Sequence, residues 1–184
     1  MSHSKNTTRA DNQQERLIKI GWITGFVDGE GCFSIGFIKQ SDKKEKQRLR
    51  RGYKTGYQVT HEFVVTQGEK SKKSLEILKE YFGTGNIFVN KRYDNHKENL
   101  YRYAVRNRKD LLEIIIPFFQ KYQLQTAKNE DFKLFAKCLK LISDNKHLTY
   151  SGLIKIVEIS SKMNRQTSRD KLIRILRDQT PTNL

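Results

Sequence analysis

Two carboxylates close an otherwise apolar stretch near the N-terminus, "GWITGFVDGEG" at residues 21–31. Asp28 and Glu30 lie among three glycines, Gly25, Gly29 and Gly31. A carboxylate at the C-terminal end of a helix is disfavoured by the helix dipole, so Glu30 requires a compensating cation. Carboxylate oxygens are hard ligands that suit Mg²⁺, and a metal ion that bridges phosphates can activate water. The alternative is structural: both carboxylates cap the helix and Gly31 ends it.

The segment before the carboxylates is predicted to be a helix. Apolar residues dominate from residue 15 to residue 27, a density typical of a helix packed on more than one side. Gly25 and Gly29, four residues apart, leave a smooth stripe on which a second helix can approach closely. Two such helices side by side would bring two Glu30 carboxylates together. We therefore expect a dimer interface that contains Trp22, Gly25, Phe26 and Gly29.

After Gly31 the hydrophobic period changes to two, which predicts a strand with one buried face. The same alternation resumes over residues 57–66. The side chains predicted to face away from the core are Ser34, Gly36, Ile38 and Gln40 on the first strand and Gln58, Thr60 and Glu62 on the second. The basic stretch between them, which contains Arg50 and Arg51, predicts a hairpin loop that follows a phosphate backbone.

The rest of the chain predicts a helix, two more strands and several helices. An amphipathic segment over residues 69–83 precedes two strands joined by a polar turn near residues 94–95. The outward positions of these strands are Phe88, Asn90 and Arg92, and either Tyr101 or Arg102 on the fourth strand, whose phase is open. Pro117 should interrupt or end the next helix. This order predicts an α+β domain with a four-stranded antiparallel sheet.

The charge balance favours a nucleic-acid partner. The chain has 36 Lys and Arg against 20 Asp and Glu, a formal net charge of +16, and a surplus of this size suits a polyanion. A curved sheet with polar outward side chains can lie in the major groove of double-stranded DNA. No apolar run is long enough to span a membrane, and residues 1–15 predict a flexible polar arm without a secretory signal. Cys32 and Cys138 support neither a zinc site nor a disulfide, which favours an intracellular compartment.

The nonapeptide "ITGFVDGEG" at residues 23–31 resembles the signature of the LAGLIDADG homing endonucleases. The similarity continues in the family's order through "VVTQGEKS" (64–71), "IIIPFFQKYQL" (114–124), "DFKLFAKCLKLI" (131–142) and "HLTYSGLIKIVEISSKMN" (147–164). This resemblance implies the family's αββαββα fold, with a curved antiparallel four-stranded sheet and C-terminal helices. We expect a single domain over residues 16–184, with a core of about 17–145 and C-terminal helices of about 146–178.

The resemblance implies unequal roles for the two carboxylates. Glu30 would be the catalytic carboxylate and would hold the metal together with Gly29. Asp28 would support the helix end by hydrogen bonding. The expected metal is Mg²⁺, or another hard divalent cation such as Mn²⁺ or Ca²⁺.

Two further site residues follow from the resemblance. Gln67, at the end of the second strand, would position the network of metal-bound water. A lysine would lie near the attacking water or the scissile phosphate, where its charge stabilises developing negative charge. Lys121 is the best match for this lysine and Lys128 is the alternative.

The function that the resemblance implies is site-specific, metal-dependent cleavage of double-stranded DNA. A chain with one motif would act as a homodimer on a long, pseudo-palindromic target and would promote intron mobility. The alternatives are an intron maturase that binds its own intron RNA, a non-catalytic DNA-binding protein on the same scaffold, and, from composition alone, a ribosome-associated protein. The compartment would be a mitochondrion, a chloroplast or the bacterial cytoplasm.

Overall fold

The computed structural model describes residues 3–40, 43–45, 48–50, 52–91, 98–164 and 168–179 of the 184-residue chain. Its helices are α1 (His3–Glu30), α2 (Lys72–Phe82), α3 (Arg108–Asp110), α4 (Ile116–Lys121), α5 (Lys128–Ser143), α6 (Tyr150–Ser160) and α7 (Asp170–Asp178), with short turns η1 (Glu69–Ser71), η2 (Leu111–Ile115) and η3 (Lys146–Leu148). Its strands are β1 (Gly31–Lys39), β2 (Lys43–Glu45), β3 (Arg48–Arg50), β4 (Tyr57–Gly68), β5 (Asn86–Asn90) and β6 (Leu100–Val105). Among these residues, no helix combines the length and the apolar character that crossing a membrane requires.

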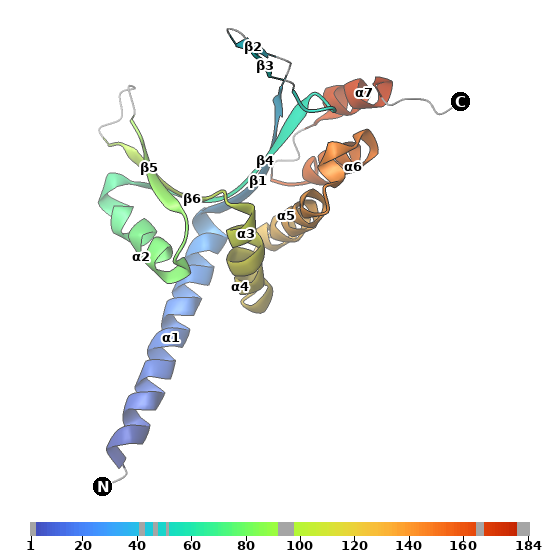
Figure 1. Cartoon of the computed structure of the whole chain (residues 1–184). Coiled ribbons are helices and arrows are strands. Elements are labelled where there is room, and N and C mark those ends of the chain that lie inside the picture. The colour runs from blue at the N-terminus through green and yellow to red at the C-terminus, as the bar shows by residue number, and fades with distance from the viewer. Residues whose placement is uncertain are drawn as a thin grey trace.

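The four long strands form one antiparallel sheet in the order β1-β4-β6-β5. The sheet is strongly curved, and all the large helices lie on its convex side, so that the concave side is left open (Figure 1). The predicted α+β fold with a four-stranded antiparallel sheet is confirmed. A small hairpin of β2 and β3 stands in the predicted basic loop.

Aromatic side chains fill the space between the sheet and the helices. Phe33 of β1 and Phe63 of β4 are fully buried and stack with ring centroids 5.1 Å apart. Phe119 of α4 meets both rings edge-on, and Phe135 of α5 lies 5.4 Å from Phe33. The convex face of the sheet is therefore the core face, as the period-two pattern predicts.

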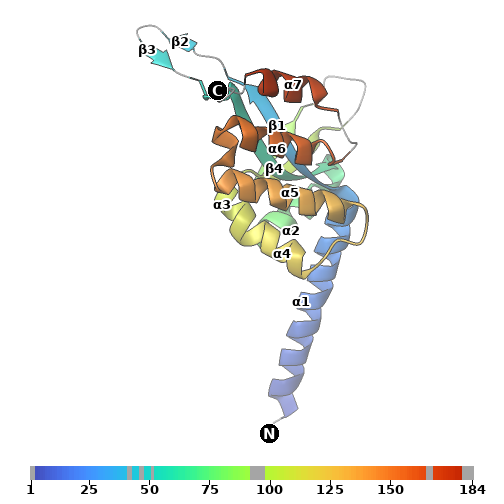
Figure 2. The same cartoon turned by 90° about the vertical axis from the view of Figure 1, so that its right-hand side faces the viewer.

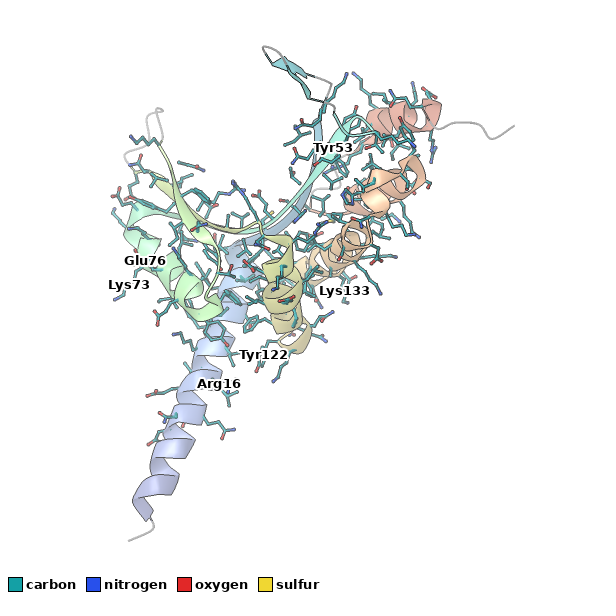
Figure 3. The ribbon with its side chains drawn as sticks, in the orientation of Figure 1. Arg16, Tyr53, Lys73, Glu76, Tyr122 and Lys133 are labelled. Atoms are coloured by element: carbon teal, nitrogen blue, oxygen red, sulfur yellow. The ribbon has the colours of Figure 1, made fainter. Side chains whose placement is uncertain are left out.

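α1 is longer than the sequence pattern suggests. The residues predicted as a flexible arm, 1–15, are helical from His3 onward, because no glycine or proline interrupts the chain before Gly21. The first half of α1 stands clear of the rest of the molecule (Figure 1), and Arg16 lies on this projecting part (Figure 3). Among residues 11–30 of α1, Ile20 is the first whose side chain is buried.

Pro117 does not end its helix. The turn η2 is a π-helical turn, and it passes directly into α4 with the proline in the first turn of that helix. A proline in a first helical turn lacks only an N–H that would be unpaired there, so it is tolerated. The segment is interrupted in its winding but remains helical from Arg108 to Lys121.

β1 is an edge strand whose outer carbonyls are occupied by the C-terminal segment. The Asn164 side chain donates to the Phe33 carbonyl at 3.1 Å, and the Arg169 guanidinium donates to the Ile35 carbonyl at 3.0 Å. Arg169 also lies over the Phe37 ring, 4.8 Å from its centroid. Helices α5, α6 and α7 pack along this side of the sheet (Figure 2).

We expect two histidines behind the sheet to make stability depend on pH. Burial, the nearby Arg108 guanidinium and His147 lower the pKa of His61 below 6.5, and burial with Arg108 also lowers the pKa of His147. Below pH 6.5 the unfolded chain therefore binds protons that the folded chain resists, and the free energy of unfolding should fall as the pH falls. Urea denaturation at pH 5 and pH 7.5 measures the difference. The His61→Gln variant should show a smaller difference; an unchanged one would contradict this cause.

Candidate active site and nucleic-acid interface

The end of α1 is fastened to the loop before α5 by Asp28. The Asp28 carboxylate accepts hydrogen bonds from the Gln125 backbone at 2.8 Å, from the Thr126 backbone at 3.1 Å and from the Thr126 hydroxyl at 2.6 Å. Partial burial alone would raise the pKa of Asp28, but these hydrogen bonds and the Lys128 ammonium hold that pKa below its usual range. The carboxylate oxygens of Asp28 are therefore already engaged in hydrogen bonds within the protein.

Replacing Asp28 with alanine should loosen this corner. Hydrogen bonds to a charged group each contribute about 1.5–3 kcal/mol, and their donors would be left unpaired in part. We expect the free energy of unfolding to fall by about 2 kcal/mol, measured by urea denaturation. Thr126→Val removes one of the three donors and should cost less; equal stability of Asp28→Ala and wild type would show that the corner is not held by Asp28.

Lys128, the first residue of α5, lies at the same corner. Its ammonium donates to the Gly29 carbonyl at 3.3 Å and to the Gly31 carbonyl. A cation at a helix C-terminus is favourable because it faces the unpaired carbonyls, so Lys128 supplies the compensating charge that Glu30 requires. Lys121, by contrast, is exposed at the end of α4 with its ammonium 5.3 Å from the Tyr122 ring. Among the described residues, Lys128 contacts the end of α1, whereas no hydrogen bond joins Lys121 to it.

Glu30 is the last residue of α1 and its side chain is exposed. The chain turns at once into β1, where Gly31 is required because a Cβ would lie 2.7 Å from the Val27 carbonyl oxygen. Gly31 pairs with Val65 of β4, so Gln67, two residues farther along β4, lies beyond the start of β1 on the side where α1 ends. Glu30, Lys128 and Gln67 thus belong to one corner of the molecule.

The donors at this corner suit a hard divalent cation, but one chain supplies only part of a ligand set. Glu30 offers an exposed carboxylate and Gly29 a backbone carbonyl that already attracts the Lys128 ammonium, and such oxygen donors are what Mg²⁺ prefers. Asp28 is engaged elsewhere. Within the described part of the chain, no group of three or more His, Cys, Asp or Glu side chains is arranged to hold a metal. A cation held at this corner would need further oxygen ligands from outside the described residues.

One side of α1 is exposed and apolar. Ile18 is 64% exposed and Trp22 is 40% exposed, and the Trp22 ring stacks on Phe26 with centroids 5.0 Å apart. A Cβ added at Gly25 or Gly29 would meet nothing within 4 Å. The predicted interface residues therefore form an open stripe with room for another helix, whereas the opposite side of α1 is packed on the sheet.

The concave face of the sheet carries the side chains predicted to face outward. The strand register places Ser34 opposite Glu62, Gly36 opposite Thr60, Ile38 opposite Gln58, and Phe88 opposite Arg102. Asn90 follows Phe88 in the same phase, and Gln40 donates to Gln58 at 2.9 Å just past the end of β1. The open phase of the fourth strand is thereby resolved, since Arg102 lies on the concave face and Tyr101 on the other. Contact of these residues with DNA stays a prediction.

The structure does not describe the side chains of three predicted DNA-binding arginines, Arg50, Arg51 and Arg92. Only the backbone of Arg50 is described, at the end of β3. Arg51, Arg92 and the turn predicted near residues 94–95 lie outside the described residues. A hollow of about 420 Å³ on the concave face is lined by Ser34, Gly36, Ile38, Thr60, Glu62 and Arg106, with Ile35 and His61 at its base.

Comparison with known families gives a match to the LAGLIDADG endonuclease model over residues 23–139. The chain belongs to the LAGLIDADG endonuclease family. The matched range runs from the last third of α1 into α5, and it therefore contains Glu30, Gln67, Lys121 and Lys128. The family resemblance that was drawn from the nonapeptide and the downstream segments is confirmed.

Relatives within the LAGLIDADG family are intron-encoded. The chain is 37% identical over 131 residues to an uncharacterised 50.9 kDa protein in ND4 intron 1 of Podospora anserina, covering 70% of this chain and 25% of that protein. It is 33% identical over 144 residues to probable intron-encoded endonuclease 2 of Neurospora crassa, covering 78% of this chain and 28% of that protein. The chain thus spans about a quarter of the length of these relatives.

Solved LAGLIDADG structures share the fold. The homing endonuclease I-TnaI is 37% identical with a TM-score of 0.66, covering 86% of this chain and 96% of that one. The meganuclease I-SmaMI bound to uncleavable DNA is 37% identical with a TM-score of 0.69, covering 87% of this chain but 49% of that one. A further structure of I-SmaMI holds cleaved DNA. The same fold therefore fills one whole chain in I-TnaI and matches half of the chain in I-SmaMI.

Sequence reasoning missed the partners of Asp28 and the contacts of Lys128 with the end of α1, and the choice between Lys121 and Lys128 as the active-site lysine stays a prediction. Thr126 lies 98 residues from Asp28 along the chain, and no local pattern marks it. The signal that could have favoured Lys128 is electrostatic: the helix that ends at Glu30 needs a cation, and Lys128 begins the next long helix after the loop. In this chain, the C-terminal end of α1 and the first residue of α5 meet at this corner.

Proposed function

We propose that this protein is a site-specific homing endonuclease that cleaves both strands of a long, pseudo-palindromic double-stranded DNA target. The observation that carries the proposal is the exposure of Glu30 at the end of α1, directly beside a concave polar sheet and held in place by the Asp28 and Lys128 contacts. Membership of the endonuclease family and the DNA-bound structures of related proteins support it.

The roles follow from the positions of the side chains. Glu30 and the Gly29 carbonyl would hold Mg²⁺, or Mn²⁺ or Ca²⁺ in its place. When bound, such an ion polarises a phosphodiester and lowers the pKa of water. Gln67 orients water at the same corner. We assign the positive charge beside the phosphate to Lys128 in preference to Lys121, because Lys128 donates to the carbonyl of Gly29, the residue before Glu30.

We propose that two copies of this chain pair along the glycine stripe of α1. One chain offers one Glu30, and cutting two strands requires two such carboxylates. A two-fold pair would place the two concave faces on the two halves of a pseudo-palindromic target. The match covers 96% of the I-TnaI chain, so I-TnaI has one copy of this fold per chain. This supports the proposal that a chain with a single copy of the fold is a complete subunit.

The experiment that tests this function is cleavage of a randomised duplex library, with the ends of the cut molecules captured and sequenced. Cutting at one recurrent sequence with Mg²⁺, and none with EDTA, is the expected result. Degradation without sequence preference, or equal cutting in EDTA, would contradict the proposal. Binding of intron RNA with assisted splicing but no DNA cutting would favour the maturase function instead.

The proposed biological role is intron mobility. An enzyme that cuts an allele lacking the intron allows repair to copy the intron into it. Relatives are named for introns of ND4 and Cox1, and these names favour the mitochondrion among the compartments considered.

A further inference from the structure

Glu62 stands at the centre of the concave face and accepts hydrogen bonds from two arginines. One oxygen accepts from Nη2 of Arg102 on β6 and, at 3.5 Å, from the hydroxyl of Ser34 on β1. The other oxygen accepts from Nε of Arg106 at 3.1 Å. The Arg106 guanidinium in turn lies 5.1 Å from the centroid of the Phe88 ring on β5. One network therefore crosses all four strands of the sheet.

A carboxylate is unexpected on a surface that approaches phosphates, because it repels them. The Glu62 side chain is only 23% exposed, however, and its charge is directed at the arginines. Arg102 is 26% exposed and Arg106 is 55% exposed. Glu62 is therefore shielded from an incoming duplex, and what it presents to that duplex is the pair of arginines that it holds.

In the described part of the chain, the Arg102 side chain uses only Nη2 in a hydrogen bond, so that its other donors can serve a further partner. An arginine has five N–H groups in a rigid planar fork, and Arg102 uses Nη2 to reach Glu62. The remaining N–H groups can reach a base edge, and the fork of an arginine matches O6 and N7 of guanine in the major groove. A side chain that is already fixed loses less conformational freedom on binding. Arg106 spends its Nε on Glu62 and is more exposed, which suits contact with a phosphate.

We propose that Arg102 reads a guanine in each half of the DNA target, and that Glu62 is the positioning residue that makes this readout possible. The proposal rests on the DNA-cleaving function proposed above. Without Glu62 both arginines would turn toward phosphates, so total affinity would hold or rise while sequence preference would fall. Glu62 thus converts general affinity for a polyanion into selectivity for one base.

The test is selection of bound duplexes from a randomised library in the presence of Ca²⁺, followed by sequencing. The wild-type protein should select guanine at one position of each half-site. Arg102→Lys keeps the charge but loses the fork, and it should lower that preference roughly 10- to 100-fold. Glu62→Gln should lower the same preference, raise affinity for a shuffled duplex and steepen the salt dependence by about one unit in log–log slope.

A double variant separates positioning from direct contact. If Glu62 acts through Arg102, then Glu62→Gln added to Arg102→Lys should change the guanine preference no further. Glu158→Gln is the matched control, because it removes a glutamate from another arginine pair, with Arg177 at 3.0 Å, on helices away from the sheet. This control should leave the selected sequence unchanged, and thermal melting of every variant checks the fold.

Each other outcome has a defined meaning. Loss of a cytosine preference in Glu62→Gln, with guanine preference intact in Arg102→Lys, would mean that Glu62 contacts a base itself and would overturn the inference. If both variants select the same DNA sequence as the wild-type protein, the inference is overturned but the proposed function stands. A wild-type protein that selects no sequence at all would overturn both.

Discussion

Replacing Glu30 with glutamine should reduce DNA cleavage by about a thousand-fold or more while leaving DNA binding close to wild type. The amide keeps the size of the side chain but removes the charge that a hard divalent cation requires. A metal ion contributes several kcal/mol to a phosphodiester transition state, and each 1.36 kcal/mol corresponds to a factor of ten in rate. Single-turnover cleavage with Mg²⁺ and gel-shift binding with Ca²⁺ measure the two effects separately.

The matched control for this variant is Glu113→Gln. Glu113 is also an exposed carboxylate, on η2, where its only described ion pair is a long one of 4.0 Å with Lys109. This control should cleave at the wild-type rate. Because the Glu30 side chain is exposed, the melting temperature should change little in either variant. Undiminished cleavage by Glu30→Gln would remove Glu30 from the catalytic site.

Replacing Gly25 with leucine should abolish dimer formation and cleavage without harming the folded chain. A side chain at Gly25 meets nothing within 4 Å in one chain, and glycine costs a helix about 1 kcal/mol relative to alanine, so each protomer should be as stable or slightly more so. In a two-fold pair the added side chain appears twice in one tight interface. We expect the dissociation constant of the dimer to rise about 100-fold or more.

Sedimentation at several concentrations and the cleavage rate on the selected target measure this effect together. Lys137→Leu, which adds the same side chain at an exposed position of α5, should remain dimeric and active. If Gly25→Leu stays dimeric and cuts DNA, the glycine stripe is not where the chains pair. An active wild-type monomer would contradict the paired-helix proposal altogether.

The sheet could be predicted from sequence because its periodicity is unambiguous. Phe33 and Ile35 alternate with Ser34 and Gly36, and a period of two leaves only a choice of which set is buried. Large aromatic side chains decide that choice. The fourth strand offered no such contrast, since Tyr101, Arg102 and Tyr103 are all large, so its phase needed the register with β5.

The corner of the site could not be predicted from sequence because it is made by long-range contacts. Lys121 and Lys128 are seven residues apart, and which of them reaches the end of α1 depends on how the chain leaves α4 at Tyr122, where the backbone departs from helical geometry. The same loop carries the backbone donors that hold Asp28. Neither lysine has a sequence pattern of its own, and the match to the family model over residues 23–139 covers both.

The contacts of Asn164 and Arg169 with the outer carbonyls of β1 have a consequence for shortened versions of the protein. An unpaired strand edge is a template on which another extended chain can add. A chain truncated after Met163 would keep its aromatic core yet leave the carbonyls of Phe33 and Ile35 open to a neighbour. Such a fragment should fold and then associate through the exposed edge of β1, strand upon strand.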